Sequence, residues 1–263
     1  MNPDLKPVKV PDFIEKKRRG EKIAVLTAYD ATMARLMDQA GVDALLVGDS
    51  LGNVIMGCDT TLSVTMDIAV HHTRAVANGT KHALVIADMP FLSYQTSVAD
   101  AVRNAGRLLA EGGAAAVKLE GGRPMIETVA RLVELGIPVM GHIGLTPQSV
   151  HQLGGYRKLG ASETDRMVED AKALQQAGAF SIVIEAITPE SAKAITVAVS
   201  IPTIGIGAGA DCDGQVLVSY DMLGLFGEFT PSFVKRYAEL GMEVRRAATE
   251  YAADVRHGRF PTK

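Results

Sequence analysis

The feature that most constrains the fold is a regular alternation, along 263 residues, of short apolar strands with longer segments of helical periodicity. Repeated strand-helix units of this kind are typical of α/β proteins with a parallel sheet. The first seven expected strands are residues 23–29, 44–49, 82–88, 115–120, 138–142, 181–185 and 202–207. The helical segments between them are residues 31–40, 67–77, 97–111, 125–135, 163–177 and 189–197, and several of these are followed by a glycine that suits a helix end.

An eighth strand, the weakest of the set, is expected at residues 222–226. Eight strand-helix units and a length close to the ~250 residues of one barrel predict a (β/α)8 TIM barrel of the α/β class. We expect residues 1–263 to form a single domain, with residues 1–22 as a helical N-terminal extension. The last helix is expected to begin behind Thr230-Pro231, to break near Gly241 and to close the barrel wall.

A basic run from Lys16 to Arg19 lies ahead of the first strand. One interpretation is a localisation signal. The other, which we favour, is the end of a helix, because Pro11 suits a first helical position, Gly20 suits a helix stop and cations in a last turn complement the helix dipole.

Charge and cysteine content narrow the class of protein further. The formal net charge of -3 supplies no excess positive field for binding phosphate backbones, so a nucleic-acid partner is not expected. Cys58 and Cys212 are far apart and lack the paired spacing of a zinc site or a disulfide framework, which indicates a reducing compartment. No apolar stretch is long enough to cross a bilayer, so we expect a soluble, cytoplasmic protein without a membrane partner.

Three consecutive expected strands each end in a carboxylate, namely Asp49, Asp88 and Glu120. Active sites of this architecture are built at the C-terminal ends of the strands, and neighbouring strands lie ~4.8 Å apart, so the three side chains can converge. Like charges that close are tolerable with a cation between them, and an all-oxygen donor set favours Mg²⁺, with manganese or cobalt as substitutes. The alternative for any one of them is a helix cap.

Lys118 and Glu185 are further candidates. Lys118 stands two residues before Glu120 and so shares its face of the strand, where it meets an anionic substrate or, with equal support from the spacing, only neutralises Glu120. Glu185 ends the sixth strand, across the barrel mouth from the second, which suits a general base. A cap of the following helix is the alternative.

Three features are harder to assign. His142 at the end of the fifth strand is either structural or an additional contact to the reacting group. The glycines of residues 205–210 formally match a dinucleotide fingerprint, but their place on the seventh strand of a barrel argues against a Rossmann fold and leaves open a phosphate loop or a tight turn. Residues 145–162 are long for a barrel connection and are a candidate lid.

Five blocks of the sequence resemble the ketopantoate hydroxymethyltransferase family, and the match runs from about Ile23 to the C-terminal helix. Each block is longer than a generic barrel strand, and the five occur in the family's order. They are Val47-Gly48-Asp49-Ser50-Leu51-Gly52, Ala87-Asp88-Met89-Pro90-Phe91, Val117-Lys118-Leu119-Glu120-Gly121-Gly122, Gly141-His142-Ile143-Gly144-Leu145-Thr146-Pro147-Gln148-Ser149 and Ile204-Gly205-Ile206-Gly207-Ala208-Gly209.

The resemblance implies a barrel of the phosphoenolpyruvate/pyruvate type and assigns roles to single residues. By this resemblance Asp49, Asp88 and Glu120 hold Mg²⁺. Asp49, Ser50, Asp88 and Lys118 contact the oxo acid, and Glu185 is the proton acceptor.

The resemblance also implies the reaction. The family makes ketopantoate, a pantothenate precursor, from 3-methyl-2-oxobutanoate (α-ketoisovalerate) and 5,10-methylenetetrahydrofolate through a metal-stabilised enolate, and its members form homo-oligomers, commonly decamers. A metal-dependent lyase or aldolase acting on a small 2-oxo acid would use the same enolate without folate, and a non-enzymatic scaffold would leave the strand-end acids unexplained.

The sequence departs from the family pattern at two places. Ser63 stands where the family usually has Pro, and the residues after Gly154-Gly155-Tyr156 differ from the usual Val-Gln-Gly-Arg. The second departure falls within the candidate lid.

Overall fold

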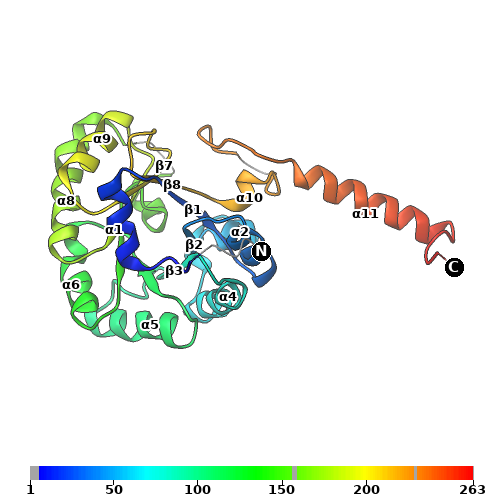
Figure 1. Ribbon diagram of the computed structural model, residues 1–263, viewed down its shortest axis with the longest axis horizontal. Coiled ribbons are helices and arrows are strands. Elements are labelled where there is room, and N and C mark those ends of the chain that lie inside the picture. The colour runs from blue at the N-terminus through cyan, green and yellow to red at the C-terminus, as the bar shows by residue number, and fades with distance from the viewer. Residues whose placement is uncertain (1–5, 156–158, 228–229, 263) are drawn as a thin grey trace. The chain divides into compact units, whose positions relative to one another are not determined.

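Eight parallel strands close into a barrel in the computed structural model, which describes residues 6–155, 159–227 and 230–262 (Figure 1). Each strand pairs with the next in the chain, and the amide of Ile23 donates to the carbonyl of Asp213 at 3.0 Å where the last strand returns to the first. The TIM-barrel prediction is confirmed. The strands are β1 (Ile23–Thr27), β2 (Ala44–Val47), β3 (Leu84–Asp88), β4 (Ala116–Lys118), β5 (Val139–Gly144), β6 (Ser181–Glu185), β7 (Thr203–Ile206) and β8 (Gly214–Leu217).

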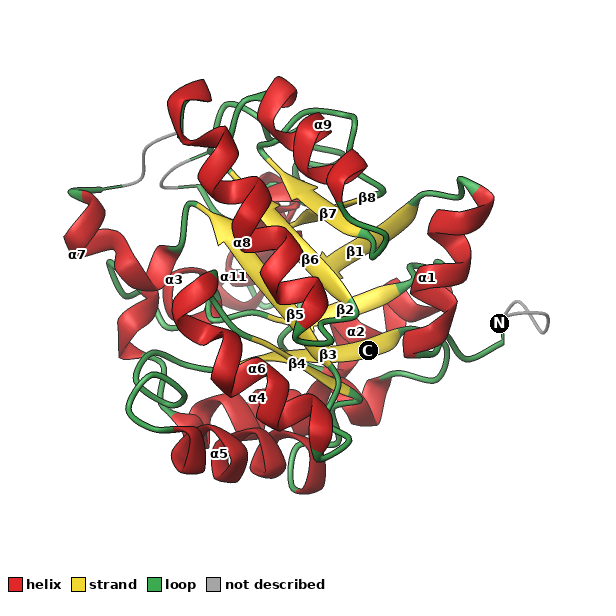
Figure 2. Cartoon of the chain, turned by 90° about the vertical axis from the view of Figure 1, so that its left-hand side faces the viewer, coloured by secondary structure: helices red, strands yellow, loops and turns green. Residues whose placement is uncertain are grey.

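Six longer helices alternate with the strands and cover the outside of the barrel, as Figure 2 shows. All six were expected, and their bounds differ from the predicted ones by a few residues at most. Side-chain caps fix several N-termini: Asp30 accepts from the amides of Thr32 and Met33, and Ser97 accepts from that of Asp100. The six are α2 (Ala31–Gln39), α4 (Met66–Gly79), α5 (Val98–Ala110), α6 (Ile126–Glu134), α8 (Thr164–Gln176) and α9 (Pro189–Ala198), and the shorter elements are α3 (Leu51–Val54), α7 (Val150–Leu153), η1 (Thr61–Ser63), η2 (Arg123–Met125), η3 (Pro147–Ser149) and η4 (Ala161–Glu163).

The N-terminal helix α1 (Val10–Arg19) packs against the barrel core through Phe13, whose ring meets that of Phe180 edge-on at 5.5 Å. Two cations of the basic run form ion pairs, Lys16 with Asp43 and Lys17 with Asp213, both at 2.9 Å. Gly20 ends the helix with a left-handed φ of 69°. The helix-end interpretation of the basic run is confirmed.

The eighth strand is Gly214–Leu217, and the prediction of a strand at residues 222–226 was wrong. Residues 219–222 instead form the short helix α10 (Ser219–Met222), followed by Gly224 at a φ of 64°. Glycine is a weak strand former, which hid β8 in the sequence. A Cβ at Gly214 would lie 2.8 Å from Cβ of Ile23, so only glycine allows β8 to approach β1 this closely.

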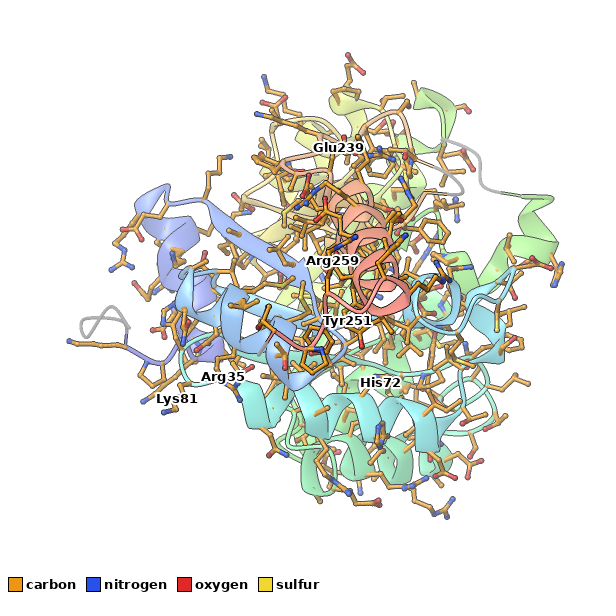
Figure 3. The ribbon with its side chains drawn as sticks, turned by 90° about the vertical axis from the view of Figure 1, so that its right-hand side faces the viewer. Arg35, His72, Lys81, Glu239, Tyr251 and Arg259 are labelled. Atoms are coloured by element: carbon orange, nitrogen blue, oxygen red, sulfur yellow. The ribbon has the colours of Figure 1, made fainter. Side chains whose placement is uncertain are left out.

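The contacts of the chain divide it into two compact units, Met1–Val216 and Leu217–Lys263. In the second unit α11 spans Leu240–Arg256, so the expected helix start behind Thr230-Pro231 was wrong, and the expected break at Gly241 falls in the first turn. The ring of Tyr251 (labelled in Figure 3) meets that of Phe260 edge-on at 5.3 Å. That residues 1–263 form one domain, with the last helix closing the barrel wall, stays a prediction.

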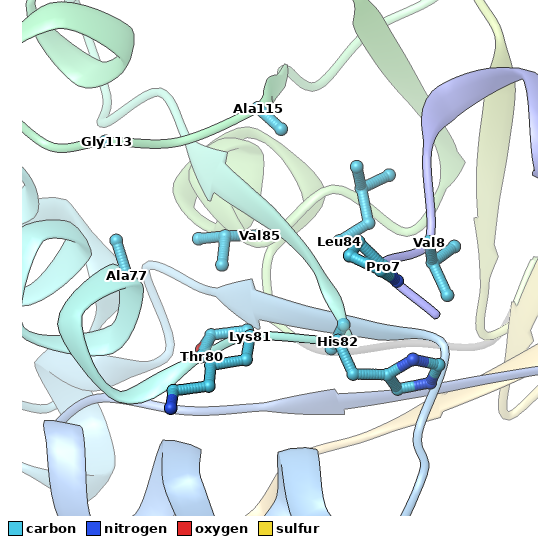
Figure 4. Close-up of a pocket in the computed structure, with 11 residues that line it drawn as sticks. Pro7, Val8, Ala77, Thr80, Lys81, His82, Leu84, Val85, Gly113 and Ala115 are labelled. Atoms are coloured by element: carbon cyan, nitrogen blue, oxygen red, sulfur yellow. The ribbon is translucent and has the colours of Figure 1, made fainter. Parts of the chain in front are cut away.

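A cavity of about 210 Å³ lies at the N-terminal end of β3, lined by Pro7, His82 and Leu84 among others (Figure 4). Asp88 is at the other end of the same strand. The cavity therefore lies away from the expected active site. Separately, none of the described helices combines the length and the apolar composition that a membrane span requires.

Candidate active site

The strand-end residues singled out from the sequence lie at the C-terminal ends of neighbouring strands. Asp88 ends β3 and Lys118 ends β4, and the two are paired in the sheet register, while Asp49 and Glu120 each follow two residues behind β2 and β4. All four side chains are buried. Strand order thus brings together, from three adjacent strands, a set of charges that is distant in sequence.

Among the described residues, two groups donate hydrogen bonds to the side chain of Asp88. Its Oδ1 accepts from Nζ of Lys118 at 2.6 Å, and its Oδ2 accepts from the backbone amide of Asp49 at 3.0 Å. A Cβ on Gly48 would lie 2.9 Å from Oγ of Ser50 and 3.5 Å from Oδ2 of Asp88, so the absence of a side chain at Gly48 allows this approach. Lys118 therefore forms its ion pair with Asp88, whereas one of the two interpretations of the spacing paired it with Glu120.

Ser50 begins the loop behind Asp49 and forms a hydrogen bond with the hydroxyl of Tyr29, with 2.8 Å between the two oxygens. Tyr29 follows β1 and is fully buried. The strand next to β2 therefore fixes the position of Ser50.

His142 on β5 is buried between two carboxylates. Its Nδ1 lies 3.5 Å from Oε1 of Glu120, and its Nε2 lies 3.3 Å from Oε2 of Glu185, which ends β6. Neither contact is aligned as a hydrogen bond, and both ring nitrogens lack such a partner among the described residues. His142 is thus part of the site, and it connects Glu185 to the acids of the neighbouring strands.

Glu185 differs from the other acids in its exposure. About 19% of its side chain is exposed, whereas 4% of the Glu120 side chain is. In an eight-stranded barrel β6 stands opposite β2, as expected. Glu185 is therefore the acid of the set that an incoming molecule reaches first.

The electrostatics of the cluster separate its members. Burial, together with the neighbouring charges of Asp88 and Glu120, raises the pKa of Asp49 to about 7. Burial lowers the pKa of Lys118, but the three carboxylates around it outweigh burial and raise that pKa, so the ammonium stays charged. The three carboxylates therefore stabilise the charged form of Lys118.

The pKa values of His142 and Glu120 shift in opposite directions. Burial and Lys118 lower the pKa of His142, but Glu120 and Glu185 outweigh them and raise it to about 9. Burial raises the pKa of Glu120, yet His142, Lys118 and the amide of Gln148 bring it below its usual value. At neutral pH His142 is accordingly a cation between two carboxylates.

Two residues that sequence reasoning missed connect the acids to each other. The side chain of Gln148, in η3, donates to Oδ2 of Asp49, and its backbone amide donates to Oε2 of Glu120, both at 3.0 Å. The hydroxyl of Tyr94 lies 2.8 Å from Oε1 of Gln148. Gln148 stands in one of the blocks quoted above, but nothing in its spacing indicated a contact with an acid of another strand.

Two further features of the sequence are the glycine-rich stretch of residues 205–210 and the candidate lid of residues 145–162. The glycine-rich stretch begins inside β7 of a barrel, which excludes the Rossmann interpretation, and Nε2 of Gln215 donates to the carbonyl of Gly209 at 2.8 Å. A phosphate role for it stays a prediction. The candidate lid contains η3, α7 and η4, and its residues 156–158 lie outside the described residues.

The chemistry of the donors fits a hard divalent cation. The carboxylates offer only oxygen, Oε1 of Glu120 is buried without a hydrogen-bond partner, and a cation would relieve the repulsion that raises the pKa of Asp49. Within the described ranges, no three Asp, Glu, His or Cys side chains already stand in the arrangement of a metal site. The fit therefore rests on the kind of donors and on the repulsion that raises the pKa of Asp49.

A buried acid cluster at the C-terminal mouth of a (β/α)8 barrel defines a class, that of barrel enzymes with carboxylate-based active sites. Within that class, residues 7–263 match the family model described as ketopantoate hydroxymethyltransferase. This chain belongs to the ketopantoate hydroxymethyltransferase family, and it is an enzyme.

Relatives in three bacteria share more than half of their residues with this chain. All three are named 3-methyl-2-oxobutanoate hydroxymethyltransferase. The relative from Pelobacter propionicus is 56% identical over 98% of this chain and 96% of its own. The relatives from Syntrophus aciditrophicus and Clostridium kluyveri are each 57% identical, over 93% and 96% of this chain and 91% of their own length.

Solved structures with a similar fold are far more distant in sequence. A phosphonopyruvate hydrolase superposes with a TM-score of 0.63 at 14% identity, covering 95% of this chain and 88% of its own. A 2,3-dimethylmalate lyase of the PEP mutase/isocitrate lyase superfamily also has a TM-score of 0.63, at 18% identity, covering 97% and 89%. These likenesses support the barrel fold.

Proposed function

We propose that this chain transfers a hydroxymethyl group from 5,10-methylenetetrahydrofolate to 3-methyl-2-oxobutanoate, giving 2-dehydropantoate (ketopantoate) for pantothenate and coenzyme A biosynthesis. The observation that carries the proposal is the buried cluster of Asp49, Asp88, Glu120 and Lys118 with the more exposed Glu185 beside it. The names of the relatives support the same reaction.

In this proposal Asp49, Asp88 and Glu120 would hold Mg²⁺, for which Mn²⁺ or Co²⁺ could substitute. When bound, the ion would supply Lewis-acid polarisation of the oxo group, which makes the adjacent C–H acidic. A phosphonopyruvate hydrolase of similar fold has been solved in complex with Mg²⁺ and oxalate, which is a small dicarboxylate.

Asp49, Ser50, Asp88 and Lys118 would contact the oxo acid. Lys118 brings the positive charge that an anionic substrate requires, and its pairing with Asp88 holds the ammonium at the C-terminal end of β4. Ser50 brings a hydroxyl held by Tyr29.

Glu185 would accept the methine proton of the substrate. Its carboxylate is the most exposed of the set, and its Oε2 lies 3.3 Å from Nε2 of His142. The electron pair left on the carbon would then form the new C–C bond to the one-carbon unit, whose bonds to the folate nitrogens break. Water would supply the hydroxyl oxygen, and tetrahydrofolate would be released. His142 is a candidate for an additional contact to the reacting group.

We also propose a cytoplasmic homo-oligomer, a decamer, that acts on small molecules and on neither nucleic acid nor membranes. The basis is the resemblance to the family and the small negative net charge.

A coupled assay for ketopantoate tests the function. With 3-methyl-2-oxobutanoate, 5,10-methylenetetrahydrofolate and Mg²⁺, the full chain is expected to form ketopantoate, and omission of the folate or addition of a chelator is expected to stop the reaction. Consumption of the oxo acid without folate would favour the lyase or aldolase alternative, and the absence of any turnover with all components present would contradict the proposal.

A further inference from the structure

We propose that Gln148 is a positioning residue, which sets the geometry of Asp49 and Glu120 for a divalent cation. The inference rests on the proposed function, because it concerns the metal site named there.

The side-chain amide of Gln148 has all its hydrogen-bonding capacity in use. Nε2 donates to Oδ2 of Asp49 and to the carbonyl of Met89, both at 3.0 Å. Oε1 accepts from the hydroxyl of Tyr94 at 2.8 Å and from Nε2 of Gln95 at 3.1 Å. Two acceptors face the nitrogen and two donors face the oxygen, so the contacts fix the orientation of the amide.

The backbone of the same residue holds a second acid. The amide N–H of Gln148 donates to Oε2 of Glu120 at 3.0 Å, and the backbone amide of Glu120 donates to the hydroxyl of Tyr94 at 3.0 Å. Gln148, Tyr94 and Glu120 are all buried. One residue therefore fixes one oxygen of a carboxylate that follows β2 and one oxygen of a carboxylate that follows β4.

This arrangement leaves the second oxygen of each carboxylate for other partners. Oε1 of Glu120 is buried and lacks a hydrogen-bond partner among the described residues. A carboxylate held through one oxygen has its other oxygen aimed in a fixed direction, which is how residues behind the ligands of a metal determine its affinity. The geometry points to Gln148 as the residue that gives Asp49 and Glu120 this direction together.

The two contacts of Gln148 can be separated by mutation. Gln148→Leu removes the donor to Asp49 but keeps the backbone N–H that holds Glu120. Tyr94→Phe leaves the side-chain amide of Gln148 in place but removes the hydroxyl that contacts both this amide and the backbone amide of Glu120. Gln175→Leu is a matched control, because Oε1 of Gln175 accepts from the amide of Ser200 at 2.6 Å on the outer side of the barrel, away from the acids.

The experiment measures Mn²⁺ binding to the full chain by electron paramagnetic resonance of the free ion, with thermal unfolding recorded for each variant. We expect Gln148→Leu to raise the Kd for Mn²⁺ by about 10- to 100-fold, as for other residues that orient metal ligands. Tyr94→Phe should raise it less, and Gln175→Leu should leave it unchanged even where it lowers the Tm.

A folded Gln148→Leu protein with the wild-type Kd would overturn the inference, while Mn²⁺ binding by the wild type would leave the proposed metal site standing. If Gln148→Leu does not fold, Tyr94→Phe decides in the same way, and a wild-type Kd in that variant overturns the inference. Absence of Mn²⁺ binding by the wild type would contradict both the inference and the metal site.

Discussion

Replacement of Glu185 by Gln is expected to slow the exchange of the methine proton of 3-methyl-2-oxobutanoate with heavy water by about 10²- to 10⁴-fold, the usual effect of losing a general base. Exchange needs only the metal and the base, since the polarised substrate can lose its proton before any folate binds. Gln keeps the shape of the side chain but cannot accept the proton. Proton NMR follows the reaction as the collapse of the methyl doublet in the presence of Mg²⁺.

Glu163→Gln is the matched control for this measurement. Glu163 is also a partly exposed glutamate, and it pairs with Arg166 on the next helix rather than with His142. Its variant should exchange at the wild-type rate. If Glu185→Gln did so as well, the base would lie elsewhere, and Glu185 would only contact His142, because Thr188 caps the following helix. His142 is the next candidate, although a pKa raised to about 9 leaves it protonated at neutral pH.

Replacement of Lys118 by Met is expected to lower the free energy of unfolding of the metal-free protein by about 3–5 kcal/mol. The side chains of Lys118 and Asp88 are each 5% exposed, and the change leaves the buried carboxyl group of Asp88 without its cationic partner. Urea denaturation in the presence of a chelator measures the effect. Mg²⁺ should restore part of the loss, because the cation would take over the neutralisation of the three carboxylates.

Lys172→Met provides the comparison, because Lys172 pairs with Glu169 at 2.9 Å on the exposed face of α8. An exposed pair of this kind contributes at most about 1 kcal/mol. A loss of similar size for Lys118→Met would contradict the view that this lysine neutralises a buried acid cluster.

Much of the barrel could be predicted because its strands are contiguous apolar runs between helices with clear stop signals. β8 could not, since its glycine and its polar Gln215 give it no apolar run. The two-residue period and the strong propensities on which sequence reasoning depends are weakest in a strand this short. The final helix was misplaced for a related reason: Thr230-Pro231 has the residues of a cap, but α11 begins only at Leu240.

The carboxylates of the site could be proposed because barrel enzymes place their chemistry at strand ends. Each of these acids stands at the C-terminal end of an expected strand. The partners of those acids could not. Asp49 and Gln148 are 99 residues apart, and the placement of His142 between Glu120 and Glu185 depends on the pairing of three strands. Contacts of this kind arise from the closed barrel, which no local pattern contains.

The most direct test of the central claim is a calorimetric titration of Mg²⁺ or Mn²⁺ into the wild type and into Asp49→Ala, Asp88→Ala and Glu120→Ala. A pH near 8 is suitable, because Asp49, with a pKa of about 7, is then ionised. The account predicts one ion per chain in the wild type and a weakened affinity in every variant, with the fold retained by circular dichroism. Unchanged metal affinity in all three variants would contradict it.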